Sequence, residues 1–310
     1  MFLSHFGEKQ PGESYYYVPL NVSNFGMANV AACNSHGEVC DHLYSHVYKE
    51  GTARRGGNEV ASLVMKTLRH LNWMDLPKNG TGKKLVLCFD NCPGQNKNGM
   101  VIRLAMYLVE MKYFESVIIC FLVKGHTKNT CDRLFNKLKE KYRKRNVFTL
   151  DQMIALMNNE YCTVLKSSVT DFKDYDEFLG DFYCSLKVVL KHHIFECRRN
   201  VKNEIVFESK EGDIDNPSQT VYKKVFKQGF YGRNEYPKTS KGYKDAVDSR
   251  VERMSDYLKT QLIPPGIPAI KQVGMFCNFR PLVELKYRND VLYEKPSQDV
   301  WDAYLGDKSI

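Results

Sequence analysis

The side chains best suited to chemistry gather between Lys84 and Asn98, where the sequence reads KLVLCFDNCPGQNKN. Asp90 supplies a carboxylate at the end of an apolar run, and side-chain amides follow it closely, at Asn91, Gln95, Asn96 and Asn98. Asp and Asn also stabilise ordinary turns, because their side chains bond to nearby backbone groups. This density of amides beside an acid favours a polar site over a plain turn.

A strand, a turn and a helix must position Asp90. The apolar run 85–89 is too short for a helix and predicts a buried strand. Pro93 and Gly94 are typical of a tight turn, and apolar residues at helical spacing predict a helix over about residues 98–113. In open α/β sheets, ligands and catalytic groups collect beyond the carboxyl ends of the strands, so we expect Asp90 to lie at such an edge.

A second strand and helix follow the same plan. Residues 116–123, SVIICFLV, predict a buried strand that ends before His126. Asn129 or Thr130 is suited to cap the next helix, whose apolar side chains recur at helical spacing, at Leu134, Phe135, Leu138 and Tyr142.

Asp132 is the second candidate carboxylate. It lies in the first turn of this helix, three residues before Phe135, so we expect its carboxylate to point toward the sheet, near Asp90 and His126. An Asp in a first turn also stabilises a helix through the helix dipole alone, and that explanation stays open.

Basic side chains provide candidate contacts to nucleic acid. The net charge of +9 favours polyanionic partners, and the densest basic run lies on the far face of the same helix. The candidate contacts are Arg54, Arg55, Gln95, Asn96, Lys97, Lys137, Lys141, Arg143, Lys144 and Arg145. Charged runs of this kind are also common on solvated surfaces that bind no nucleic acid, which is the alternative interpretation.

The cysteines indicate a reducing compartment. The chain has ten of them but no CxxC pair, and several fall inside apolar strand patterns, where a thiol acts as a small hydrophobic group. No apolar run approaches the length of a membrane span, so we expect an intracellular protein, nuclear or cytoplasmic.

One hairpin contains several metal-binding side chains, but their spacing matches no common zinc pattern: Cys33, His36, Cys40, His42 and His46.

The order of the predicted elements indicates the fold class. A hairpin over 15–48 and a helix precede the two strand–helix pairs, which gives the order strand, strand, helix, strand, helix, strand, helix. This is the order of an α/β RNase H-like fold, a mixed sheet flanked by helices, without its first strand. We assign that fold to residues 1–150 and predict a C-terminal α+β extension over 151–310.

RNase H-like nucleases use carboxylates to hold two divalent metals about 3.5–4 Å apart at a phosphodiester. In such a site Asp90 and Asp132 are the candidate catalytic metal ligands. His126 is then a candidate auxiliary ligand or proton carrier.

Three segments resemble a family of eukaryotic proteins associated with mobile elements: EGTARRGGNEVASLVMKTL, VLCFDNCPGQNKN and FLVKGHTKNTCDRLFNKLKEKYRK. That family carries D-N-C-x-G-Q-N-K-N and G-H-T-x5-D motifs. The resemblance covers about residues 12–160, with a weaker match over 268–299. It implies a DDE-type transposase derivative with an RNase H-like domain, which acts on DNA phosphodiesters with Mg²⁺ or Mn²⁺.

One part of the family pattern is missing from this sequence. Family members carry an Asp at the end of a strand just before the region that matches residues 5–11, whereas this sequence begins at Met1 without that strand. We therefore expect the first acidic ligand to be absent and catalysis to be incomplete or lost. The alternative functions are a nucleic-acid-binding module without catalysis and a protein-interaction remnant of a mobile element.

Overall fold

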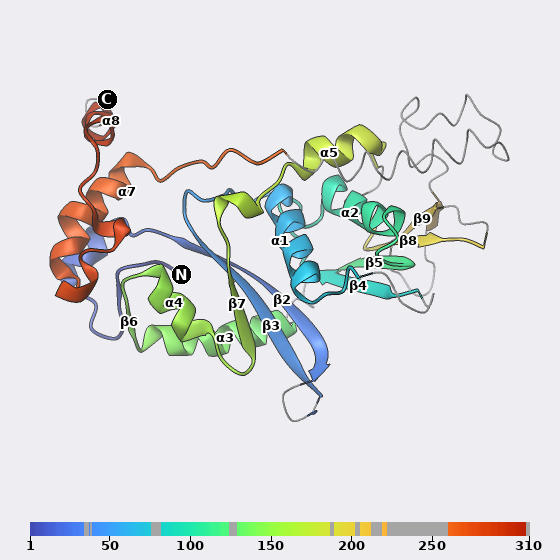
Figure 1. Cartoon of the computed structure of the whole chain (residues 1–310), viewed down its shortest axis with the longest axis horizontal. Coiled ribbons are helices and arrows are strands. Elements are labelled where there is room, and N and C mark those ends of the chain that lie inside the picture. Colours follow the sequence, from blue (N-terminus) through green and yellow to red (C-terminus); the bar gives the residue numbers. More distant parts are fainter. Residues whose placement is uncertain are drawn as a thin grey trace. The chain divides into compact units, whose positions relative to one another are not determined.

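The chain folds into two compact units (Figure 1). The computed structural model describes residues 1–33, 37, 39–75, 82–123, 129–186, 189–201, 205–211, 219–221 and 260–307. The first unit comprises Met1–Arg54, Lys128–Val169 and Ile263–Ile310, and the second comprises Arg55–Thr127 and Thr170–Leu262. Because the chain passes between the units repeatedly, their division does not coincide with the domain boundary predicted at residue 150.

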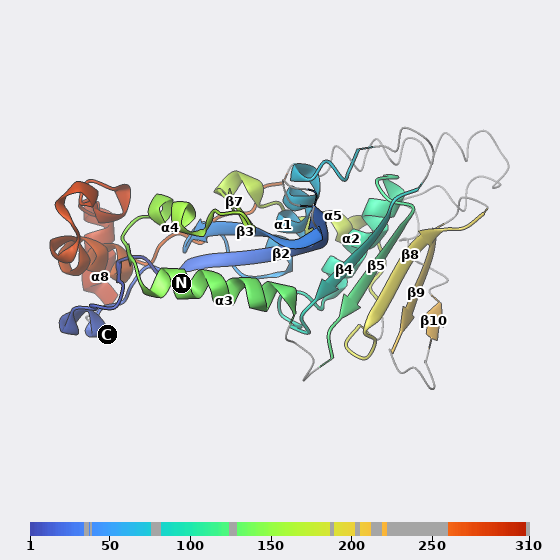
Figure 2. The same cartoon turned by 90° about the horizontal axis from the view of Figure 1, so that it is seen from below.

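A three-stranded sheet organises the first unit. Strands β2 (Val22–Cys33) and β3 (Val39–Lys49) form the predicted hairpin, and β7 (Cys162–Lys166) adds parallel to β3. Helices α3 (Thr130–Arg143) and α4 (Leu150–Met157) pack on this sheet, and α3 runs along the hairpin (Figure 2). Strand alternation sends Leu43 and Val47 of β3 into the core, where both are fully buried.

Segments from both ends of the chain complete the first unit. Strands β1 (His5–Phe6) and β6 (Asn146–Val147) pair antiparallel. The C-terminal segment forms α7 (Ala269–Gly274), a π-helical turn (Met275–Phe279) and α8 (Gln298–Asp307). The buried Tyr293 hydroxyl donates to the Phe148 carbonyl at 2.7 Å and lies 2.9 Å from Ser4 Oγ, so it ties three distant segments together.

Single turns of 3₁₀ helix span Gly12–Tyr16, Val169–Asp171, Arg280–Leu282, Leu285–Tyr287 and Val291–Tyr293. Among the helices that the structure describes, none is long and apolar enough to cross a membrane.

A mixed sheet organises the second unit. Within the described part of the chain, its strand order is β10 (Gln219–Val221), β9 (Ile205–Lys210), β8 (Ile194–Arg199), β5 (Ser116–Phe121) and β4 (Lys84–Phe89). Strands β4 and β5 are parallel, since a helix connects them, and the other pairs are antiparallel. The helices α1 (Gly57–His70), α2 (Gly99–Glu110) and α5 (Tyr175–Phe182) pack on one another, and α2 also contacts the sheet.

The predicted strands and helices are present, but their grouping into sheets differs from expectation. The hairpin and the strand before Asp90 were expected in one RNase H-like sheet, yet they belong to two different sheets. Strands β8 and β9 were assigned to the C-terminal extension, yet they extend the sheet of β4 and β5. Periodicity reports which face of a segment is apolar, whereas strand partners depend on contacts between distant segments. The architecture is therefore mixed α/β, with sheets flanked by helices.

Strand β4 is also less buried than its apolar sequence predicts. Leu85, Leu87 and Phe89 are at most 8% exposed, whereas Val86 between them is 57% exposed. Alternation thus covers one face of β4 and leaves the other open to solvent.

Candidate functional site

The turn after β4 is closed largely by its own backbone and one amide. The Cys92 carbonyl accepts the N–H groups of Asn96 and Lys97, both at 2.9 Å. Asn98 caps α2, because its Oδ1 accepts a backbone N–H of the first helical turn at 2.9 Å. Turn and helix formation therefore account for Asn98, one of the amides that favoured a polar site.

Asp90 lies on the exposed side of this turn. Its carboxylate accepts a hydrogen bond from Nδ2 of Asn96, which is only 8% exposed. The other end of that amide, Asn96 Oδ1, is buried and has no hydrogen-bond partner among the described residues. Leaving a buried acceptor unpaired costs roughly 1–3 kcal/mol, so a ligand donor would be stabilising there.

Lys97 is buried at the same turn. The residue is 2% exposed, and no carboxylate in the described part of the chain pairs with its ammonium group. Its Nζ lies 5.6 Å from the ring centroid of Phe121, the last residue of β5. Burial lowers the pKa of Lys97, because the charged form loses its hydration.

His193, just before β8, lies beside this lysine and was not selected from the sequence. Its carbonyl accepts the N–H of Phe121 at 2.7 Å, so the residue is the neighbour of the ring that Lys97 contacts. The Nδ1 atom of His193 is buried and has no hydrogen-bond partner among the residues described. Burial lowers the pKa of His193, and the positive charge of Lys97 lowers it further. Only the antiparallel pairing of β5 with β8 brings the two residues together.

Asp132 helps to cap the N-terminus of its own helix, α3. Asn129 caps α3 by accepting the Asp132 N–H at 3.0 Å, and the Asp132 carboxylate accepts the Asn129 N–H at 3.4 Å. This reciprocal arrangement is a capping box, and Asp132 is exposed rather than turned to the sheet. Asp132 lies in the first unit and Asp90 in the second. His126 lies outside the described residues.

The predicted nucleic-acid contacts divide by exposure. Asn96 and Lys97 are buried and Gln95 is half-buried, so this group does not form an open surface. Arg54 and Arg55 are exposed in the loop before α1. The basic residues of α3 and of the segment after it are exposed as well: Lys137, Lys141, Arg143, Lys144 and Arg145.

The described residues do not assemble a complete metal site. No three His, Cys, Asp or Glu side chains among them are grouped to hold an ion. Asp90 and the unpaired Asn96 Oδ1 are oxygen donors of the kind that Mg²⁺ binds, but two such donors leave most of the octahedral positions of Mg²⁺ to water or to a substrate. In the hairpin considered for zinc, His42 Nε2 lies 2.8 Å from the Thr163 hydroxyl instead. We therefore derive no metal-dependent step.

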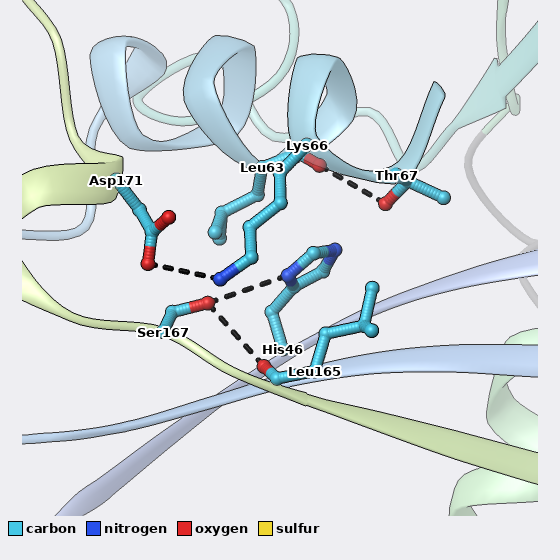
Figure 3. Close-up of polar contacts among 7 residues, drawn as sticks. All are labelled: His46, Leu63, Lys66, Thr67, Leu165, Ser167 and Asp171. Carbon is cyan, nitrogen blue, oxygen red and sulfur yellow. Dashed lines mark hydrogen bonds and ion pairs between the residues drawn. The ribbon is translucent and has the colours of Figure 1, made fainter. Parts of the chain in front are cut away.

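A serine–histidine contact lies in the core of the first unit (Figure 3). His46 Nδ1 lies 3.4 Å from Ser167 Oγ, and that hydroxyl donates to the Leu165 carbonyl at 3.4 Å. His46 is 0% exposed and Ser167 is 5% exposed, so a substrate cannot reach them and the contact is structural. Figure 3 also shows an ion pair of the second unit, in which Lys66 and Asp171 are 2.9 Å apart.

A family model described as a domain of unknown function (DUF7869) matches residues 29–215, more than half of the chain. No curated protein matches the sequence, and no solved structure matches it. The matched segment includes Asp90, Lys97, His193 and the whole of α3.

Proposed function

Because the chain belongs to the DUF7869 family, whose function is unknown, we propose a function from the structure: the chain binds DNA along the basic face of α3. The observation that carries this proposal is a run of exposed cations that form no ion pair with any described residue. They are Lys137, Lys139, Lys141, Arg143, Lys144 and Arg145. The ion pair that α3 does form, between Arg133 and Asp41, lies nearer its other end.

The α3 face also concentrates charge around one aromatic ring. The ammonium groups of Lys137 and Lys141 lie 5.1 Å and 5.0 Å from the ring centroid of Tyr161. Like charges one helical turn apart repel by roughly 0.2–0.5 kcal/mol, so an anion near the two ammonium groups would be stabilising. A backbone phosphate removes this repulsion, and its binding releases the counterions condensed on the DNA.

The origin we propose is an RNase H-like, DDE-type transposase of a mobile element. The order β2, β3, α1, β4, α2, β5, α3 supports it, together with the two sequence motifs around Asp90 and Asp132. A DNA partner implies a location inside the cell, in the nucleus or the cytoplasm.

The test measures binding of a fluorescent DNA duplex by anisotropy at several salt concentrations. The double variant Lys137→Met/Lys141→Met should show a log–log salt slope less steep by about 1–2, since each phosphate contact contributes about 0.9. The control variant Lys9→Met/Lys295→Met removes the same charge at exposed positions of the same unit. Equal slopes for the parent and both variants would rule out the α3 surface.

Divalent-metal chemistry on DNA phosphodiesters is the second candidate function. It is favoured by the exposed Asp90 carboxylate, which lies just beyond the carboxyl end of a parallel strand with an unpaired amide oxygen beside it. Calorimetric titration with Mn²⁺ should then show saturable binding by the parent and none by Asp90→Ala. The same heat from both proteins would exclude Asp90 as a ligand of Mg²⁺ or Mn²⁺.

A further inference from the structure

The buried ammonium group of Lys97 lacks an adequate partner within the described residues. Among the described residues, its ammonium group contacts the face of Phe121, and a cation over an aromatic ring gains roughly 0.5–2 kcal/mol. Removing an ammonium ion from water costs several kcal/mol even after the protein relaxes. The ring therefore does not offset the burial of the charge, and the deficit is the size that a bound anion could supply.

Two residues next to Lys97, one in sequence and one across β5, carry polar atoms without a partner among the described residues. His193 Nδ1 and Asn96 Oδ1 are both buried without hydrogen-bond partners among the described residues. His193 follows the buried His192, whose Nδ1 is satisfied by Ser209 Oγ at 2.7 Å, so the two neighbouring imidazoles differ in their bonding. The negative charge of the exposed Glu211 raises the pKa of His193, against the larger lowering by burial. The Lys97 ammonium group and the His193 imidazole thus form one site, whose N–H groups can donate hydrogen bonds to a ligand.

We propose that Lys97 and His193 bind a phosphate group at the ends of β4 and β5. The ammonium group supplies the charge, and the imidazole supplies an N–H donor from Nδ1. Asn96 Oδ1 then accepts from a protonated phosphate oxygen or from a hydroxyl group of the ligand. This site belongs to the second unit and is independent of α3, which lies in the first.

The first experiment follows the melting temperature of the whole chain in millimolar inorganic phosphate, against sodium chloride at equal ionic strength. Phosphate should raise the melting temperature of the parent and leave that of Lys97→Met unchanged. Methionine is similar in length and removes the buried charge, so this variant should fold. His193→Phe keeps the charge and should weaken phosphate binding by about tenfold, which corresponds to roughly 1.4 kcal/mol.

Two further arms identify the source of the phosphate. A short single-stranded oligonucleotide is compared with and without a 5′-phosphate, both in the Lys137→Met/Lys141→Met background that weakens α3. A stronger effect of the 5′-phosphorylated strand points to a nucleic-acid end, and equal effects with a response to inorganic phosphate point to a free phosphate.

Two results would overturn the proposal. If the parent does not respond to phosphate, or responds as Lys97→Met and His193→Phe do, Lys97 is a neutral or ring-stabilised core residue and the site does not exist. Equal salt slopes for the parent and the α3 variant would overturn DNA binding along α3 without bearing on the phosphate site, so the two proposals fail separately.

Discussion

Gly26 determines how closely α3 approaches the hairpin, and its replacement tests that packing. A Cβ atom at Gly26 would lie 2.3 Å from Cζ of Phe135 on α3 and 2.9 Å from Cδ1 of Leu43 on β3. Both separations are shorter than carbon atoms tolerate, and Leu43 is fully buried. The Gly26→Ala variant must therefore displace the Phe135 ring, which lies between α3 and the hairpin.

The cost follows from two opposing terms. Overpacking of a core typically costs about 1–3 kcal/mol, and the atoms at 2.3 Å and 2.9 Å are the ends of side chains, so this site lies near the middle of that range. Replacing Gly by Ala also lowers the conformational entropy of the unfolded chain, which stabilises the folded state by about 0.4–1 kcal/mol. We expect the free energy of unfolding to fall by about 1–2 kcal/mol.

Urea denaturation followed by circular dichroism measures this change. Gly12→Ala is the matched control in the same unit, because no atom lies within 4 Å of the Cβ that it adds. The double variant Gly26→Ala/Phe135→Leu shortens the clashing side chain and should show a favourable coupling of at least about 0.5 kcal/mol. If Gly26→Ala is as stable as Gly12→Ala, α3 does not pack on β2 as the structure has it.

Other substitutions test local features of the two units. Cys120 donates a hydrogen bond that lowers the pKa of Cys88 to about 6, so alkylation of Cys88 should rise through about pH 6. Site-resolved mass spectrometry should find this midpoint raised in Cys120→Ala and kept low in Cys120→Ser, which retains a donor. Asn129→Ala removes the cap of α3 and should lower the free energy of unfolding by about 1 kcal/mol in urea. Gly51→Ala should destabilise more than Gly12→Ala, because Gly51 has φ +87° and its Cβ would lie 2.6 Å from the backbone of Gly266.

Much of the local structure could be predicted from the sequence. The alternating hairpin, the short apolar strands β4 and β5 and the amphipathic helices α2 and α3 all carry signals within about twenty residues. Asn129, one of two predicted caps, does cap α3, because a short polar side chain before an apolar period satisfies free backbone N–H groups.

Burial and pairing could not be predicted, because they arise between distant segments. Lys97 lies in the polar run Gln95–Asn98 and was interpreted as a surface contact, yet it is 2% exposed. His193 becomes its neighbour only because β8 pairs antiparallel with β5 across more than seventy residues of chain. No periodicity within either segment reports that contact.

The partners of the two candidate carboxylates decide where a ligand is best sought first. Asp132 already accepts the N–H of its own helix cap, so its position is explained by the stability of α3. Asp90 is exposed and bonded to Asn96, and water solvates its charge without further help. Lys97 differs from both, because its charge is buried and no described carboxylate compensates it. Since an uncompensated buried charge is the costlier state, the second unit has more to gain from an anion at Lys97 than from a cation at Asp90.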